Sequence, residues 1–366
     1  MERLNIVSGE QNQLNKVKNR GGGRIQYLDA LRGFTMLLVV MTHVSTFCLG
    51  LIGTDTFSYS KIFGEFRMPL FFFVSGFVLY KSGFEWSFNN TITFLKKKLT
   101  VQILSPFLFL LVFAHLNDVD LQKALFDYQK NGYWFTFTLF QYFCFYILIQ
   151  WTLKLIRLQG IFKDYYIIAI GLIFYILTVY SFVVKYNLNE GVYGLLGIPT
   201  WHYFLFFLLG TRIRKYFSQF ESLLDSNYFT LIVAGLFFGL NIYSELSCMS
   251  STLYNLLLSV SGLILIFAMF RKYQSYFNSE KRIGQIAQFV GRRTLDIYLL
   301  HYFFIFSNMS AILPNFSLYK SPFIEFMCSL GMAILILSAC LLISSVLRLN
   351  PLLAHFLFGQ KLSQNK

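Results

Sequence analysis

Two ionisable side chains interrupt the first long apolar stretch of the chain, which reads LDALRGFTMLLVVMTHVSTF over residues 28–47. Arg32 and His43 lie eleven residues apart in this stretch. In an α-helix this separation corresponds to a rise of about 16.5 Å and to about three full turns, so both side chains leave the same face. The spacing therefore predicts a guanidinium and an imidazole on one wall of a single cavity.

Two interpretations of this pair remain open. An imidazole can take a proton from a hydroxyl at neutral pH, and a cation upstream could hold an anionic donor, so His43 and Arg32 together fit the chemistry of acyl transfer. The alternative is structural: Arg32 anchors the helix at a membrane interface, and His43 makes a hydrogen bond to a neighbouring helix. Ionisable residues within spans are rare and usually face a polar interior.

Four further residues are candidates for the site. Asp29 lies three residues before Arg32 on the same helical face, where it could orient or neutralise that cation; an ordinary first-turn acid is the alternative. Arg67 could contact an acceptor or an acyl intermediate, or else a lipid headgroup. Tyr298 and His301 could line the acceptor site, although an interfacial belt of aromatic and histidine side chains explains them nearly as well. No metal is expected, because no histidine pair or acid-rich loop has metal-ligand spacing.

The composition is that of a membrane protein. Of the 366 residues, 56% are hydrophobic and only 13% are charged, whereas an ordinary soluble domain has about 25% charged residues. A spanning helix needs about 20 predominantly apolar residues. We therefore predict an all-α, polytopic integral membrane protein with about ten transmembrane helices, at residues 31–51, 67–80, 99–114, 134–153, 165–184, 199–210, 228–243, 253–270, 295–306 and 323–347.

The positions of the basic residues predict the topology. With ten spans, most Lys and Arg residues fall in the segments on the side of the N-terminus, which indicates that both termini are cytoplasmic. The net charge of +14 lies at the ends of apolar segments, so the expected partner is the lipid bilayer and not nucleic acid. We predict a cytoplasmic tail over residues 1–26, a membrane domain over 27–348 and a second cytoplasmic tail over 349–366.

One segment between predicted spans has a helical pattern of its own. It reads SEKRIGQIAQFVGRRTL over residues 279–295. Its apolar residues Ile283, Ile286, Phe289 and Val290 recur at helical spacing among basic residues, a pattern typical of a helix that lies on the inner membrane surface.

Four motifs resemble those of a known family. LDALRGFTMLLVVMTH, FRMPLFFFVSGFVLY, GYWFTFTLF and VGRRTLDIYLLHY are similar to segments of the membrane acyltransferases of acyltransferase family 3, and the similarity runs over about residues 27–348. The resemblance implies a ten-span enzyme of the bacterial cytoplasmic (inner) membrane. It would use acyl-CoA, usually acetyl-CoA, as the acyl donor and acylate a hydroxyl of an exported carbohydrate, either a polysaccharide or a glycolipid. His43 would be the catalytic residue and Arg32 its partner.

The chain departs from the family pattern at one place. Many members carry Arg-x-x-Arg at the start of the third span, whereas this chain reads KKKLTVQILSP, with Gln102 at the second position. Lys96, Lys97 and Lys98 could substitute, together with Arg32, as a cationic surface for the phosphates of CoA. A carrier or flippase for a polysaccharide precursor and a scaffold subunit of an export complex are the competing functions. The sequence leaves open whether the group is acetyl or succinyl, and whether the protein forms a homodimer.

Overall fold

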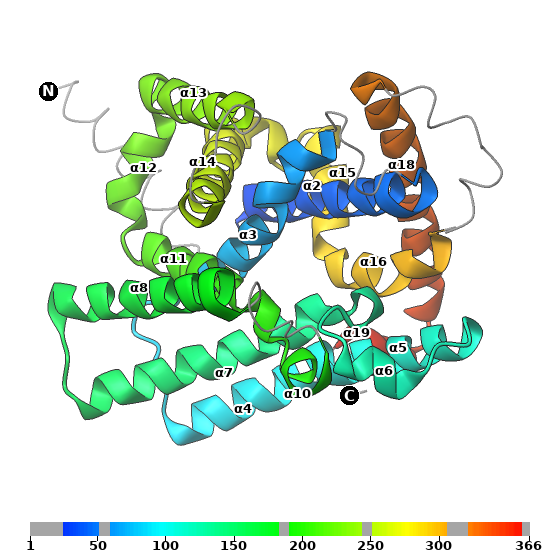
Figure 1. Ribbon diagram of the computed structural model, residues 1–366, viewed down its shortest axis with the longest axis horizontal. Helices are drawn as coiled ribbons and strands as arrows, with labels where there is room; N and C mark the ends of the chain where they lie inside the picture. The colour runs from blue at the N-terminus through cyan, green and yellow to red at the C-terminus, as the bar shows by residue number, and fades with distance from the viewer. Residues whose placement is uncertain (1–24, 51–58, 183–189, 244–250, 306–320, 361–366) are drawn as a thin grey trace, which may run out of the picture.

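The protein is built from helices throughout the part of the chain that is described. The computed structural model describes residues 25–50, 59–182, 190–243, 251–305 and 321–360, and every regular element in these ranges is helical (Figure 1). A helix satisfies its backbone hydrogen bonds within its own segment, which a chain surrounded by lipid requires. The predicted all-α class is confirmed for these residues.

The helices follow one another with short connections. The first is α2 (Gln26–His43), which continues as a π-helical turn over Val44–Cys48. The others are α3 (Tyr59–Leu79), α4 (Phe88–Leu99), α5 (Ser105–Leu116), α6 (Leu121–Phe126), α7 (Trp134–Leu155), α8 (Gly160–Ile176), α10 (Gly191–Leu195), α11 (Phe204–Lys215), α12 (Phe217–Asp225), α13 (Asn227–Tyr243), α14 (Ser251–Lys272), α15 (Arg282–Arg292), α16 (Thr294–Leu300), α18 (Pro322–Leu347) and α19 (Pro351–Phe358).

Seven helical segments in the described residues are long and apolar enough to cross a membrane, or eight if the bent pair of α12 and α13 forms one span. Each of the ten predicted segments overlaps a helix, although the last residues of 31–51, 165–184 and 295–306 lie outside the described residues. Two of the ten do not meet this criterion. The helix α7 has 22 residues and polar side chains such as Gln141 and Gln150. The helix α16 has only seven residues, followed by a 3₁₀ turn over His301–Phe304. Together these rise roughly 18 Å, well short of a hydrocarbon core of about 30 Å.

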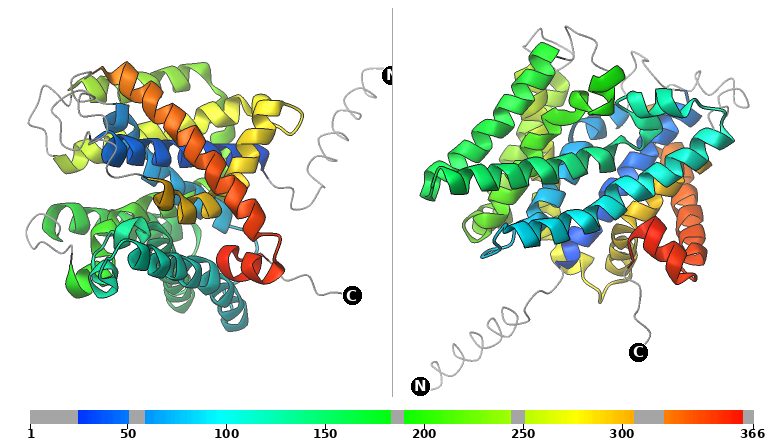
Figure 2. Two further views of the ribbon diagram at one scale, coloured as in Figure 1. Left: turned by 90° about the vertical axis from the view of Figure 1, so that its right-hand side faces the viewer. Right: turned by 90° about the horizontal axis from the view of Figure 1, so that it is seen from below.

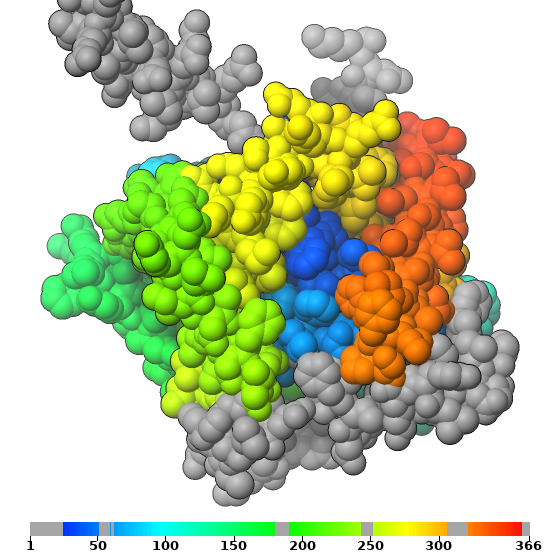
Figure 3. Space-filling view, turned by 90° about the horizontal axis from the view of Figure 1, so that it is seen from above, coloured from blue at the N-terminus to red at the C-terminus, as the bar shows by residue number. Residues whose placement is uncertain are grey.

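The helix α2 lies at the centre of the protein. It contacts α3, α14, α15, α16 and α18, and 67% of its spanning window is buried, against 28% for α18. On the face shown in Figure 3, parts of α2 and α3 are visible as a central patch between α13, α14, α15 and α18. Ionisable side chains on α2 are therefore kept away from lipid by the surrounding helices.

Glycines allow two pairs of helices to cross at backbone contact. Where α3 crosses α11, a Cβ on Gly76 would collide with the carbonyl oxygen of Phe207, and a Cβ on Gly210 would collide with that of Phe73. Each helix thus supplies a glycine against the backbone of the other. Small residues at such crossings let membrane helices approach closely and gain van der Waals contact.

The crossing of α2 with α15 is built in the same way. A Cβ on Gly33 would collide with the carbonyl oxygen of Ala287, and a Cβ on Gly291 would collide with that of Asp29. The predicted helix in this region is observed, with Ala287 and Gly291 packed on α2 and with Ile283 and Ile286 exposed. The exposed apolar residues suit contact with lipid.

Buried ion pairs join peripheral helices to the centre. Seen from below, α4 and the turn that joins it to α5 run beside α7 (Figure 2). Asp164 on α8 binds Arg212 and Lys215 on α11 at 2.5 Å and 2.6 Å. Asp296 on α16 binds Arg348, at the end of α18, at 2.7 Å. These pairs fix short or exposed helices onto the core.

We expect Gly210→Ala to lower the free energy of unfolding by about 1–3 kcal/mol, because the added methyl group must force α3 and α11 apart. Gly235 on α13 is the matched control, since a Cβ there meets nothing within 4 Å and alanine is the better helix former by about 1 kcal/mol. Thermal unfolding of the two purified variants in detergent measures the difference. Equal stability of the two would contradict the tight crossing.

Candidate active site

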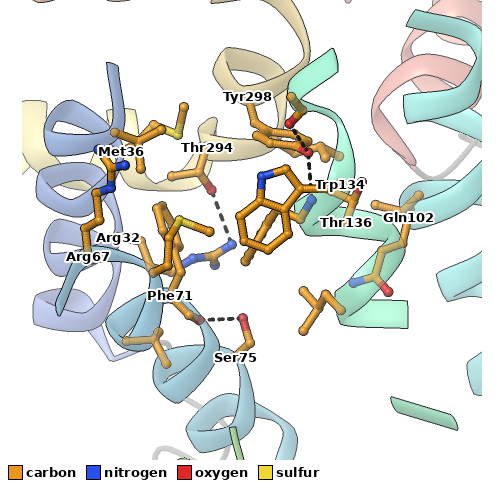
Figure 4. A pocket seen from close by; sticks show the side chains of 18 of the residues that line it. Arg32, Met36, Arg67, Phe71, Ser75, Gln102, Trp134, Thr136, Thr294 and Tyr298 are labelled. Carbon is orange, nitrogen blue, oxygen red and sulfur yellow. Dashed lines mark hydrogen bonds between the residues drawn. The ribbon is translucent and has the colours of Figure 1, made fainter. Parts of the chain in front are cut away.

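A cavity of about 280 Å³ lies between α2, α3, α7, α16 and the segment that joins α4 to α5. Figure 4 looks into it. One wall is a single stripe of α2, formed by Arg32, Met36, Val39 and His43 at helical spacing. The structure therefore brings Arg32 and His43 together in the way that the eleven-residue separation predicts, with two apolar side chains between them.

His43 is held at one end of the cavity by an aromatic cluster. Its Nε2 lies 3.1 Å from the hydroxyl oxygen of Tyr302, and either group could be the donor of this hydrogen bond. The imidazole is stacked on Phe47 at a centroid distance of 5.7 Å and lies 5.4 Å from the ring of His301. These contacts fix both the position and the plane of the ring.

Tyr298 and His301 differ in their relation to the cavity. The ring of Tyr298 lines it, but the hydroxyl donates to the carbonyl of Gly132 at 3.0 Å and accepts from the backbone N–H of Phe135 at 3.1 Å. His301 is fully buried and is not among the lining residues; its Nδ1 is bonded to the backbone carbonyl of Tyr298 at 2.8 Å. Its ring packs on that of Tyr302 at 4.1 Å. This geometry favours a positioning role for His301 over direct contact with a substrate.

Arg67 lines the cavity from α3 and does not lie at a lipid surface. Two residues later, Pro69 interrupts the hydrogen bonding of this helix, because proline has no N–H to donate to the carbonyl four residues earlier. That carbonyl, of Glu65, instead accepts a hydrogen bond from Ser259 on α14 at 2.8 Å. A neighbouring helix thus stabilises the turn that carries Arg67.

Arg32 and Lys98 give the cavity a cationic end. A guanidinium N–H of Arg32 donates to the hydroxyl of Thr294 at 3.3 Å (Figure 4). The ammonium group of Lys98 lies over the ring of Phe143, 4.7 Å from its centroid. Gln102, which replaces the expected arginine, is buried and lines the cavity. A polar but uncharged side chain therefore stands at this position.

Besides His301, three predicted residues do not line the cavity. Lys96 and Lys97 are exposed on α4 and do not line it, so Lys98 is the member of the predicted lysine cluster that does. Asp29 is buried at the crossing of α2 with α15 and does not line the cavity either. Its position favours a structural role at this crossing.

The lining of the cavity has an unbalanced charge. Arg32, Arg67 and Lys98 line it together with His43, whereas no aspartate or glutamate is among the described residues of its wall. Most of the remaining surface is apolar. Buried charge is costly unless it is paired, so this arrangement suits a ligand that carries negative charge and develops more of it next to His43.

A strained loop closes the cavity beside His43. Lys130, Asn131 and Gly132 all have positive φ values, of 47°, 48° and 95°, and a Cβ on Gly132 would collide with the ring of Tyr302. The ammonium group of Lys130 fixes this loop by donating to the carbonyl of Gly194 at 2.9 Å. Burial lowers the pKa of Lys130 to about 8, against the opposing effect of Asp127. Glycine at position 132 thus lets the backbone approach Tyr302.

The sequence alone did not single out several residues of the site. Tyr302, Trp134 and Thr294 belong to two of the motifs quoted above, GYWFTFTLF and VGRRTLDIYLLHY, but nothing in their spacing indicates contact with α2. The hydrogen bond between Tyr302 and His43 joins residues 259 positions apart. It depends on the 3₁₀ turn after α16, which the apolar pattern does not reveal.

Two π-helical turns border the cavity. One follows His43 directly, over Val44–Cys48, and the other, Thr100–Leu104, carries Val101 and Gln102 into the lining. Such turns are rare in proteins, and those that occur are often at functional sites, because they change the direction of side chains without ending the helix. Their placement supports the assignment of this cavity as the candidate active site.

Comparison with known proteins gives one match. The model of a family described as an acyltransferase domain (acyltransferase family 3) matches residues 25–344, which is most of the chain and includes every helix that lines the cavity. No curated protein and no solved structure matches the sequence.

We expect a cysteine placed in the cavity wall to react with a water-soluble maleimide. Ser75 lines the cavity and is half-buried, so Ser75→Cys in a background without the native cysteines should be labelled in the folded protein. Ser329 is fully buried away from the cavity, which makes Ser329→Cys the matched control. Equal labelling rates for the two variants would argue against solvent access to the cavity.

Proposed function

This chain belongs to acyltransferase family 3 and is a multi-pass membrane acyltransferase, and we propose that it transfers an acetyl group from cytoplasmic acetyl-CoA to a hydroxyl of an exported carbohydrate. The acceptor would be a surface polysaccharide or a glycolipid. The observation that carries this proposal is the cavity that Arg32 and His43 line together, with an apolar wall between them.

The cationic end of the cavity suits the donor. Arg32 and Lys98 both line the cavity. Arginine and lysine are the common partners of phosphate groups in proteins. The anionic part of acetyl-CoA would be held at this end, with Gln102 offering hydrogen bonds where other family members offer a second arginine.

The apolar section between the two ends suits the acyl group. Met36 and Val39 separate Arg32 from His43 on α2. A thioester that extends along this wall would bring its carbonyl group to His43 while the charged part of CoA stays at the cationic end. Only the small neutral acetyl group then has to pass through the hydrocarbon layer, which a charged molecule crosses at high cost.

His43 would act as the general base. It takes the proton of the acceptor hydroxyl while the hydroxyl oxygen attacks the thioester carbon. The carbon–sulfur bond then breaks, and the departing thiolate of CoA receives the proton from His43. If the acetyl group first passes to a group of the protein, the same proton exchange occurs twice. The hydrogen bond to Tyr302 would hold the imidazole in line for this step.

We propose a topology in which all ten apolar segments are inserted and both termini are cytoplasmic. The basic residues between these segments support it, and the shorter α16 would enter the membrane domain against α2 and α18, which it contacts. The bacterial inner membrane is the corresponding location.

We expect His43→Ala to lower glycan acetylation by at least about 10²-fold, because a positioned general base contributes about 10²–10⁴ in rate. Arg32→Ala should raise the KM for acetyl-CoA more than it lowers kcat, since it removes part of the donor site. Both variants are compared with wild type in membranes, with radiolabelled acetyl-CoA and with the amount of inserted protein measured in parallel.

A fully inserted His43→Ala variant with unchanged acetylation would overturn the catalytic assignment. The competing carrier function is tested in the same membranes. A carrier would move a carbohydrate precursor across the membrane without consuming acetyl-CoA, and its transport would not depend on added acetyl-CoA.

We expect Tyr302→Phe to lower kcat by about fivefold, because it removes one hydrogen bond to His43 worth about 1 kcal/mol. Phenylalanine keeps the ring that packs on Gly132 and His301, so the fold should be retained. Tyr128 is half-buried and lies outside the cavity lining, and Tyr128→Phe is the matched control. Wild-type kcat in Tyr302→Phe would show that the hydroxyl does not orient His43.

A further inference from the structure

Arg67 carries buried donor groups that the protein does not use. Its Nε and Nη1 atoms are buried and have no hydrogen-bond partner within the described part of the chain. The side chain lines the same cavity as His43. Buried polar groups in native proteins are almost always hydrogen-bonded, and an exception calls for an explanation such as a ligand.

Glu65 on the same helix is the nearest carboxylate that acts on Arg67, but it makes no ion pair with the guanidinium and does not line the cavity in the described part of the chain. The lining residues next to it on α3, Met68 and Phe71, are apolar, and no carboxylate is among the described residues of the cavity wall. A guanidinium presents several N–H groups in one plane, which match two acceptor positions on a carbonyl or carboxyl group. The unused donors therefore suit an oxygen acceptor, and they bind it more strongly when negative charge develops on it.

The backbone holds Arg67 in place without the help of such a ligand. Pro69 leaves the carbonyl of Glu65 without its helical donor, and Ser259 of α14 satisfies that carbonyl from outside the helix. The turn that contains Arg67 is thus attached to a second helix. A donor fixed before the reaction needs little rearrangement when charge develops, which is the condition for strong electrostatic stabilisation.

Taking the proposed function as its premise, we propose that Arg67 is a catalytic residue that stabilises the oxyanion of the acyl transfer. When a hydroxyl oxygen attacks the thioester carbon, the electron pair of the C=O bond moves to its oxygen, and Arg67 donates N–H hydrogen bonds to that oxygen. Arg67 keeps its own proton throughout. As the carbon–sulfur bond breaks, the carbonyl group re-forms, and His43 returns the transferred proton to the thiolate.

This role is the same whether acetyl passes directly to the carbohydrate or through an acyl intermediate, because each transfer forms a tetrahedral oxyanion. It also divides the cations of the cavity by function. Arg32 and Lys98 hold the charge that acetyl-CoA carries from the start, whereas Arg67 responds to charge that appears only during the reaction.

The test uses membrane vesicles from cells that express the full chain and contain the endogenous glycan, with radiolabelled acetyl-CoA as the donor. In Arg67→Gln we expect kcat to fall by about 10²–10³-fold, the effect of removing one oxyanion donor, and the KM for acetyl-CoA to stay near the wild-type value. Arg67→Lys should retain part of the rate, since it keeps the charge but loses the planar pair of donors.

Chemical rescue separates this role from a packing role. In Arg67→Ala, guanidinium added to the vesicles should restore part of kcat by occupying the vacated position, and rescue requires that the variant is folded. His43→Ala should not respond to guanidinium. Arg282 is exposed on α15 and lies outside the cavity lining, so Arg282→Ala is the control for loss of an arginine elsewhere.

Two results would overturn the proposal for Arg67. An unchanged kcat with a raised KM for acetyl-CoA would assign Arg67 to binding of the ground state, and unchanged kcat and KM would assign it to packing. Failure of the proposed function gives a different result, because wild-type vesicles would then incorporate no label from acetyl-CoA into glycan.

Discussion

The arrangement of the whole protein follows from one electrostatic constraint, the presence of three cationic side chains around an apolar cavity whose described wall contains no carboxylate. Within the described residues no aspartate or glutamate lines the cavity, whereas Asp164 pairs with Arg212 and Asp296 pairs with Arg348 elsewhere in the fold. The protein thus has buried acids, but places them outside the cavity. The cations of the wall favour an anionic ligand, because a ligand with negative charge recovers part of the cost of burying them.

Close crossings between helices keep this cavity narrow and separate from lipid. Gly76 and Gly210 bring α3 against α11, while Gly33 and Gly291 bring α2 against α15. With backbones in contact, the helices cannot slide or rotate without collision. The stripe on α2 therefore faces α3 and α16 in a fixed orientation, and the distance between a cation at one end and the imidazole at the other is set by the geometry of a single helix.

The sequence predicted those features that depend on one helix or on composition. The helical class and the positions of the apolar segments follow from local pattern, and the shared face of Arg32 and His43 follows from α-helical geometry alone. Contacts between helices could not be obtained in this way. The hydroxyl of Tyr302 reaches His43 only because α16 ends early in a 3₁₀ turn, and Asp29, although close to Arg32 in sequence, is buried where the backbones of α2 and α15 meet. Of three adjacent lysines with similar sequence context, Lys98 alone lines the cavity, because the side chains of Lys96 and Lys97 leave α4 in other directions.

The π-helical turn over Val44–Cys48 changes how the first span is to be compared among relatives. A π-turn accommodates one residue more than an α-helix of the same path, and one residue corresponds to about 100° of rotation. Positions after Val44 are therefore out of phase with the stripe that ends at His43. A homologue that lacks this extra residue would keep its histidine aligned with the arginine while its following side chains point elsewhere, so an ungapped alignment through this region would pair residues that occupy different faces of the helix.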